Sequence, residues 1–436
     1  MKRWPRMVAA IIMVVLAAGG AGAQEDPPEM DPLLKLLVEQ GIITQAQAEG
    51  VQREYDRRQG KAVDEPTGAP AVVEQPVVED AQPQVAAETK APEKWYDRID
   101  FKGDLRLRFE AFDQEGISSN NRRERFRVRI RPGIYTQITD WMDVGLQLRS
   151  GDPQDPVSDN ATIDGGFTMK DIAISEGFAH FDPTSWLDLT FGKFDPRKKW
   201  TVTDMQWDDD VTVEGAMEEF SIGFFEANLY QYSLEEVRGG SDAYLLGGQV
   251  LGKFGSDAIG TFKVGGGYDN WIRPQLVADL TLSGDLRGNE VTNLLDDNDQ
   301  LVSDFQIFNA FASWSFTRSE RWPIKVYLFG YTNTGAAGLG QDYDTGYFAR
   351  VQVGDFKKKG QFMFRLSRYY SEPDALFYVF AQSDTTRASD VDGYRFDVRM
   401  GFVKRSFFNL TWYHTDAVYA DVPTMDRLQM DYIIVF

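Results

Sequence analysis

The sequence predicts an all-β protein, a transmembrane antiparallel β-barrel of about 16 strands that follows a short N-terminal helical pair and a disordered linker. Two observations carry this prediction. From residue 95 onward, apolar and polar side chains alternate in segments of roughly ten residues, which short and long polar connections separate in turn. The chain also ends on such a segment, and its last residue is the aromatic Phe436.

The last segment, residues 425–436, shows the alternation clearly. One face of this expected strand carries the apolar residues Leu428, Met430, Tyr432, Ile434 and Phe436. The other face carries Arg427, Gln429 and Asp431. An apolar outer face and a polar inner face suit the wall of a membrane barrel, where this would be the strand that closes the barrel. The alternative is an edge strand of a soluble sandwich.

The polar face of the first two strands is strongly basic. Its arginines are Arg106, Arg108, Arg125, Arg127, Arg129 and Arg131. A row of arginines would also suit the wet face of a sandwich. However, the same alternation recurs through most of the domain, and a sandwich with that many strands would be unusual. In a barrel the charged face lines a water-filled lumen and no strand edge stays open.

The strand candidates number sixteen. They span residues 99–112, 122–136, 142–151, 171–181, 186–194, 213–221, 225–234, 243–254, 260–271, 303–316, 322–333, 345–353, 360–371, 390–403, 406–417 and 425–436. An even count puts both barrel ends on the periplasmic side. The long connections, which include 152–170, 195–212, 272–302 and 372–389, then lie outside the cell.

The N-terminal part is expected to hold three segments. Residues 1–23 have the basic start, the apolar stretch and the small residues Ala21, Gly22 and Ala23 of a secretory signal peptide. Residues 24–60 are expected to form a periplasmic helical pair, and the Pro-, Ala- and Glu-rich residues 61–94 a disordered linker. The barrel is then expected over residues 95–436.

Composition argues against several other functions. The formal net charge of −21 disfavours a nucleic-acid partner, and the absence of cysteine leaves no thiolate metal site. The two histidines, His180 and His414, have no serine nucleophile at a recognisable spacing, and they are interpreted as surface residues. Residues 247–253 resemble a phosphate-binding loop, but Phe254 stands where a hydroxyl should bind magnesium. We therefore expect no catalytic residues, metal or cofactor.

Acidic residues gather in the expected external loops. Asp152, Asp155 and Asp159 form one group, and calcium would suit their oxygen ligands, although solvated loop charge is the preferred interpretation. The loop at 195–212 supplies a second set, Asp204, Asp208, Asp209 and Asp210, and Glu214 follows shortly after the loop.

The arginine ladder and the second acidic set suggest a constriction. Like charges on adjacent strands repel unless water screens them or carboxylates pair with them. One hypothesis is that the loop at 195–212 folds into the barrel, sets its narrowest point and creates a field across it. The other is that the arginines only solvate the lumen wall and bind loop acids or lipid A structurally. Lumen aromatics, Tyr327, Phe329 and Tyr331, would form a stacking track for a sugar if they face inward.

Several motifs resemble the putative porin family of Gram-negative outer membranes. They lie at 33–44 (LLKLLVEQGIIT), 122–133 (RRERFRVRIRPG), 150–155 (SGDPQD), 170–172 (KDI) and 207–215 (WDDDVTVEG). In the last motif Val213 stands where the family pattern has proline. The resemblance implies a sixteen-stranded barrel with an N-terminal helical stub, passive diffusion of small solutes, and a homotrimer.

The expected function is therefore an outer-membrane porin for small hydrophilic solutes or ions, without catalysis. Two alternatives stay open: a channel selective for an anion such as phosphate or for a sugar, and a structural protein that tethers the envelope. The expected partners are outer-membrane lipid and lipopolysaccharide, the barrel-assembly machinery, which reads the last strand, and two further copies of the chain.

Overall fold

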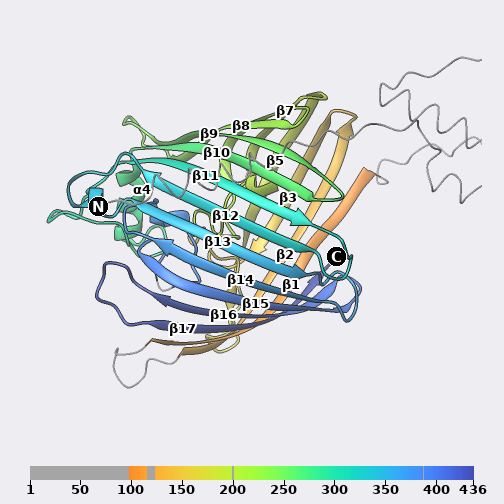
Figure 1. Ribbon diagram of the computed structural model, residues 1–436. Coiled ribbons are helices and arrows are strands. Elements are labelled where there is room, and N and C mark those ends of the chain that lie inside the picture. Colours follow the sequence, from red (N-terminus) through yellow and green to blue (C-terminus); the bar gives the residue numbers. More distant parts are fainter. Residues whose placement is uncertain (1–97, 115–122, 199–200, 386) are drawn as a thin grey trace, which may run out of the picture. The chain divides into compact units, whose positions relative to one another are not determined.

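The computed structural model describes residues 98–114, 123–198, 201–385 and 387–436. These residues form a closed antiparallel barrel of sixteen long strands and one strand of two residues, β4 (Figure 1). The barrel confirms the predicted all-β, sixteen-stranded part of the fold class. The expected signal peptide, helical pair and linker lie outside the described residues.

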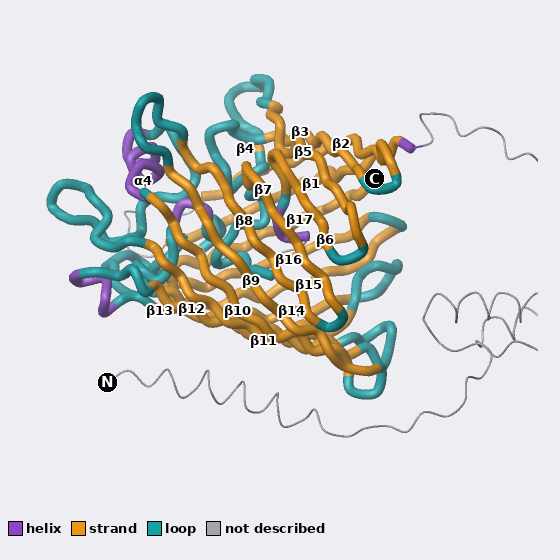
Figure 2. The backbone as a smooth tube through the Cα atoms, turned by 90° about the horizontal axis from the view of Figure 1, so that it is seen from above, coloured by secondary structure: helices purple, strands orange, loops and turns teal. Residues whose placement is uncertain are grey.

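Each long strand pairs with the next along the chain, and the last pairs with the first. The strands are β1 (Ile99–Gln114), β2 (Arg123–Thr139), β3 (Met142–Ser150), β4 (Ala161–Thr162), β5 (Ile172–Thr184), β6 (Leu187–Phe194), β7 (Val213–Ile222), β8 (Phe225–Glu235), β9 (Ala243–Ser256), β10 (Gly260–Ile272), β11 (Phe305–Phe316), β12 (Ile324–Asn333), β13 (Thr345–Gly354), β14 (Phe362–Ser371), β15 (Val391–Val403), β16 (Ser406–Asp416) and β17 (Met425–Val435). The long loops gather at one end and the short turns at the other (Figure 2).

Four short helices lie in the long loops of the described residues. They are η2 (Pro196–Lys198), α4 (Pro274–Ser283), η3 (Gly338–Asp342) and η4 (Tyr378–Phe380). Among the described residues no helix is long and apolar enough to cross a membrane.

The barrel wall separates an apolar exterior from a polar interior. On β17, Leu428 and Met430 are partly exposed, whereas the alternate residues Arg427, Gln429 and Asp431 are buried. A similar alternation runs along β8, β15 and β16, because successive side chains point to opposite sides of the wall. Aromatic pairs such as Trp141 with Phe181 and Trp186 with Phe220 lie near the short turns, as expected for an aromatic girdle at a membrane interface.

The barrel closes between β1 and β17. Leu107 lies opposite Tyr432 and Phe109 opposite Met430. The backbone N–H of Gly103 donates to the carbonyl oxygen of Phe436 at 3.1 Å, and the Phe436 N–H donates back at 3.0 Å. The Phe436 ring stacks on Phe101 with 5.6 Å between ring centroids. The last residue thus contributes both backbone pairing and ring packing to the seam.

Deletion of Phe436 is expected to reduce barrel assembly more than the conductance of the molecules that do assemble. The deletion removes the terminal hydrogen-bond pair with Gly103 and the stack on Phe101, whereas no lumen side chain changes. The heat-modifiable band of folded barrel in outer-membrane fractions measures assembly, and single-channel recording measures conductance. Normal assembly of the truncated chain would contradict the expected role of the terminal residue.

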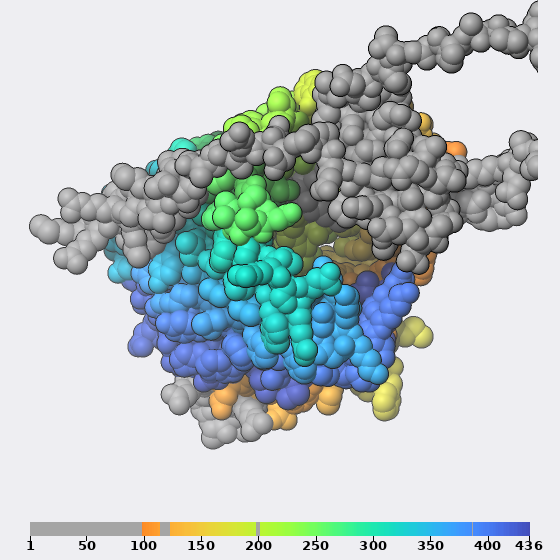
Figure 3. Space-filling model, turned by 45° about the vertical axis from the view of Figure 1, so that its right-hand side comes forward, coloured from red at the N-terminus to blue at the C-terminus, as the bar shows by residue number. Residues whose placement is uncertain are grey.

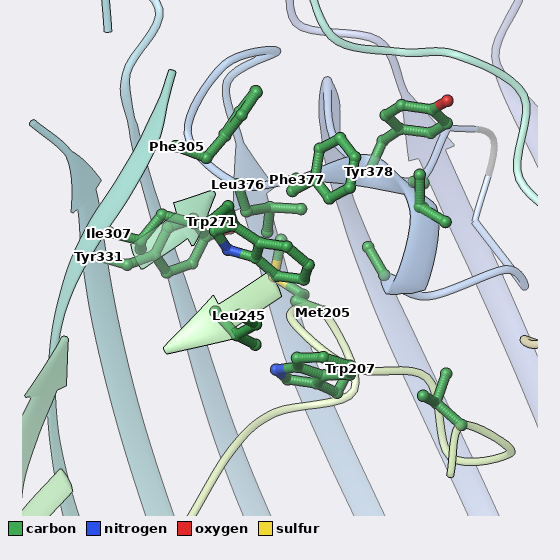
Figure 4. Close-up of a cluster of buried hydrophobic side chains, with 14 of the residues drawn as sticks. Met205, Trp207, Leu245, Trp271, Phe305, Ile307, Tyr331, Leu376, Phe377 and Tyr378 are labelled. Carbon is green, nitrogen blue, oxygen red and sulfur yellow. The ribbon is translucent and has the colours of Figure 1, made fainter. Parts of the chain in front are cut away.

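An apolar core fills part of the barrel interior beneath the long loops. Trp207 of the β6–β7 loop stacks on Trp271 of β10 and on Phe380 of η4, with centroid separations of 5.7 and 5.4 Å. Phe377 packs between Trp271 and Phe305 at 4.9 and 5.3 Å (Figure 4). Burial of these large rings holds two loops inside the barrel, because each ring removes a large apolar area from water.

Candidate pore constriction

Three long loops enter the lumen and contact the basic wall. They are the β3–β5 loop (151–171), the β6–β7 loop (195–212) and the β14–β15 loop (372–390). A central space of about 80 Å³ remains between them and the wall. Its basic lining comes from Arg106, Arg108, Arg395 and Arg399 of the barrel strands, and its acidic lining includes Asp208, Asp209, Asp210 and Asp384 of the loops.

The β3–β5 loop covers the arginine ladder of β1 and β2. Arg106 Nη2 donates to the side-chain oxygen of Asn160 at 2.6 Å, and Arg127 Nη2 donates to Ser158 Oγ at 2.9 Å. Asp159 pairs with Arg149 at 2.7 Å and with Arg131 at 3.3 Å. The loop then forms β4, which pairs with β2 where the shorter β3 has ended. This loop therefore both neutralises arginines and completes the wall.

The interpretation of the first acidic group as solvated charge is wrong for Asp159. Its side chain is 1% exposed and its carboxylate contacts two arginines. The sequence placed the acid correctly in a loop but contained no sign that the loop turns inward. Asp152 instead lies near the surface and pairs with Arg287 at 2.7 Å. Among the described residues, no group of three or more acids or histidines is placed to hold a metal ion.

Asp155 makes the β3–β5 loop sensitive to pH. Burial raises the pKa of this carboxyl to about 6. Because the folded-state pKa exceeds the unfolded value, the loop is most stable when Asp155 is protonated, and this stability falls as the pH rises through about 6. We expect proteases to cleave the wild-type loop faster at pH 8 than at pH 5, relative to a matched peptide. Asp155→Asn should remove most of that difference, and an unchanged pH dependence would contradict the assignment.

Asp210 of the β6–β7 loop lies at the centre of the ladder. Its carboxylate contacts Arg129 at 3.0 Å, Arg131 at 3.6 Å and Arg106 at 3.8 Å. Burial alone would raise the pKa of Asp210, but the three guanidinium groups outweigh burial and hold the pKa below its usual range. Asp210 is therefore ionised and serves as the shared counter-charge of three inward arginines.

Asp204 anchors the same loop to the opposite wall. Its oxygens accept hydrogen bonds from Arg350 and Arg395, both at 2.8 Å, and from the Tyr369 hydroxyl at 2.8 Å. Burial raises the pKa of Asp204, but Arg350 and Arg395 reverse the effect, so that the pKa lies below its usual range. The loop therefore spans the lumen: Asp204 contacts side chains of β13, β14 and β15, and Asp210 contacts side chains of β1 and β2.

Asp208 joins two loops and has no arginine partner among the described ion pairs. Its Oδ2 accepts hydrogen bonds from the N–H and the hydroxyl of Ser383, both at 2.9 Å. The Asp208 N–H in turn donates to the carbonyl of Phe380 at 2.8 Å. Burial and the nearby charges of Asp210 and Asp384 raise the pKa of Asp208 well above its usual value. These bonds fix the β6–β7 loop against the β14–β15 loop.

Asp384 lines the central space and was missed by sequence reasoning. It pairs with Arg427 of β17 at 2.8 Å and lies 3.9 Å from Arg108. Arg108 also binds Asp431 of β17 at 2.7 Å. Arg125 and Arg427 both bind the buried Glu110, which likewise was not among the expected site residues.

Among the described ion pairs, Asp210 is the one expected acid that pairs with the arginine ladder of β1 and β2, whereas Asp209 and Glu214 pair with other cations. Asp209 is 76% exposed in its side chain and contacts Arg197 of its own loop at 3.2 Å. Glu214 follows the buried Val213 on β7 and therefore points to the opposite side of the wall, where it pairs with Lys193 at 2.7 Å. The alternation of β7, which begins at Val213, turns Glu214 away from the lumen.

The expected aromatic track is largely covered. Tyr327, Phe329 and Tyr331 lie on the inner face of β12, but Phe329 and Tyr331 are 3% and 5% exposed and belong to the apolar core. Tyr327 lines a lumen cavity. The expectation of an open sugar track is therefore not met for Phe329 and Tyr331, because the inserted loops cover them.

Wider spaces lie on the short-turn side of the constriction. One cavity of about 810 Å³ extends beside β1, β2 and β3, and another of about 380 Å³ lies beside β10 to β13. Figure 3 brings this end of the barrel forward and shows it hollowed. Both spaces are larger than the charged central space.

The histidines play no part in this arrangement. His180 Nδ1 lies 3.0 Å from the Thr190 hydroxyl, and His414 Nδ1 lies 3.1 Å from Asp426 on the outer face of the barrel. Neither contact brings a serine nucleophile to the imidazole.

Comparison with known proteins agrees with this architecture. A family model described as putative porin matches residues 113–237, from the end of β1 to just beyond β8. No curated protein matches the chain. The structure of OprB from Pseudomonas putida is similar with a TM-score of 0.52 and 12% identity, over 78% of this chain and 95% of that chain. This likeness is one of fold.

A substituted form of the porin of Rh. blastica matches more weakly, with a TM-score of 0.45 and 10% identity over 78% of this chain and 100% of that chain. The resemblance to the putative porin family that the sequence motifs indicate is confirmed over residues 113–237, and the closed barrel of sixteen long strands agrees with it.

Proposed function

We propose that this protein is an outer-membrane porin, a water-filled channel for passive diffusion of small hydrophilic solutes and ions. The observation that carries the proposal is the closed barrel whose outer face is apolar and whose inner face is charged. Such a wall fits a bilayer outside and water inside. The loops that enter the lumen reduce the passage to a charged centre, which favours small solutes.

Arginines of the wall and carboxylates of the loops face one another across the centre. The paired charges hold the loops in place. They also leave a passage with a basic and an acidic side, so that a permeating solute crosses an electric field directed from the wall to the loops. The exposed Asp209 and the partly exposed Arg399 are the groups that permeating ions would meet.

The proposal includes the assembly and the partners that the sequence suggested. Residues 1–23 are the export signal, the following helical pair and linker are periplasmic, and three copies form a trimer in contact with lipid and lipopolysaccharide. The contact of Phe436 with Gly103 and Phe101 supports a last strand that the assembly machinery can place at the seam.

Liposome swelling tests the channel function. The purified mature chain should admit small sugars at rates that fall steeply with solute size, because the centre is narrow. Loss of swelling after heat unfolding is the control. A folded, membrane-inserted protein that admits no solute and carries no ion current would contradict the proposal.

Deletion of residues 24–94 separates the channel from the structural alternative. The shortened chain should retain its conductance in bilayers. A tethering protein would instead lose envelope integrity on this deletion, measured as release of periplasmic protein from cells.

A further inference from the structure

We infer that the lumen holds a binding site for small oxyanions, in the cavity that β10 to β13 form with the β6–β7 loop. The inference rests on the proposed function, since the site lies in the lumen of the proposed channel. The cavity has a volume of about 380 Å³, within the range of small-molecule sites. It lies on the short-turn side of the constriction.

The charges that line this cavity are all positive. Lys263 of β10, Lys325 of β12 and Arg350 of β13 line it, and no carboxylate does so among the described residues. Neither lysine forms an ion pair within the part of the chain that the structure describes. A third lysine, Lys253, lies directly opposite Lys263 on β9. Like charges at that position repel, and a bound anion between them would relieve the repulsion.

Hydroxyl groups stand beside the lysines in the strand register. Ser313 lies opposite Lys263, and Ser315 lies opposite Lys325 and Thr261. Directly opposite residues share a face of the sheet, so ammonium and hydroxyl donors converge on the cavity. The oxygens of a phosphate or carboxylate accept several such donors at once, and lysine binds phosphate as a point charge.

The larger lumen cavity has a different composition. Its lining combines cations such as Lys102 and Arg131 with a larger number of carboxylates, among them Asp143 and Glu176, so it offers no excess of positive charge. An anion that enters from either mouth therefore gains most in the smaller cavity. Arg350 also connects that cavity to the constriction, because it shares Asp204 with Arg395.

Block of chloride current by inorganic phosphate tests the inference. In planar bilayers with the full mature chain in KCl, phosphate should reduce the current of the wild type, whereas glucose at the same concentration should not. In Lys263→Gln/Lys325→Gln the half-blocking phosphate concentration should rise by about tenfold, because two ammonium contacts in a partly screened lumen are lost. Lys357→Gln/Lys358→Gln is the matched control, since it removes the same charge from an exposed turn at the same end.

Three outcomes would overturn the inference while leaving the channel function intact. These are a conducting wild type that phosphate does not block, equal half-blocking concentrations in the lysine variant and the control, and equal block by glucose and phosphate. A folded protein that forms no channels would contradict the proposed function itself.

Discussion

Asp204→Asn is expected to enlarge the single-channel conductance and to shift the channel toward anion passage. The substitution leaves Arg350 and Arg395 without their shared carboxylate and weakens the bond of the Tyr369 hydroxyl. Removal of one partner from a buried ion pair costs about 3–5 kcal/mol. The β6–β7 loop should therefore detach from β13–β15 and open the centre, while two arginines become available to anions. The size of discrete current steps in planar bilayers measures this change.

Asp209→Asn is the matched control, because it removes an exposed carboxylate from the same loop without removing an anchor to the wall. It should alter selectivity slightly and leave the step size unchanged. Equal step sizes for wild type and Asp204→Asn would show that Asp204 does not hold the loop across the lumen.

Arg129→Ala is expected to shift selectivity in the opposite direction. Arg129 contacts Asp104 at 2.8 Å and Asp210 at 3.0 Å. Its loss leaves two carboxylates underneutralised beside the passage. A unit charge about 4 Å away contributes about 1 kcal/mol even in water, which corresponds to a change of about fivefold in the cation-to-anion permeability ratio.

Arg318→Ala serves as the control for Arg129→Ala, because Arg318 is exposed in the β11–β12 turn, outside the lumen. It removes the same charge and should leave the permeability ratio unchanged. A ratio that responded equally to both variants would indicate a general charge effect and would contradict a local role of Arg129.

The barrel was predictable because each strand carries its own signal. Alternation in residues 425–436 located β17, and the polar positions Arg427 and Asp431 were correctly assigned to the lumen face. The alternation of apolar and polar residues along a strand can be recognised without knowing which distant parts of the chain the strand contacts. The exact first residue of a strand is harder to predict, and it decides which side of the wall each following side chain faces. Glu214, the second residue of β7, was expected in the lumen but faces the other side.

The paths of the inserted loops could not be predicted in the same way. Asp204 and Arg350 are 146 residues apart, and nothing in either local sequence announces their pairing. Asp384 is a single acid in a polar stretch, so no local pattern indicates its role. The strand β4 has only two residues, which is too short to show an alternation. One signal was available: residues 375–380 are an apolar run inside an external loop, and such a run requires burial. It marks the β14–β15 loop as one that folds inward.

The reversal potential under a KCl gradient tests the central claim, that loop carboxylates and wall arginines together form the constriction of a water-filled channel. Measured in the same bilayers, Asp204→Asn should move the potential toward the chloride equilibrium and Arg129→Ala toward the potassium equilibrium. If both variants have the same reversal potential as the wild type, the claim is contradicted.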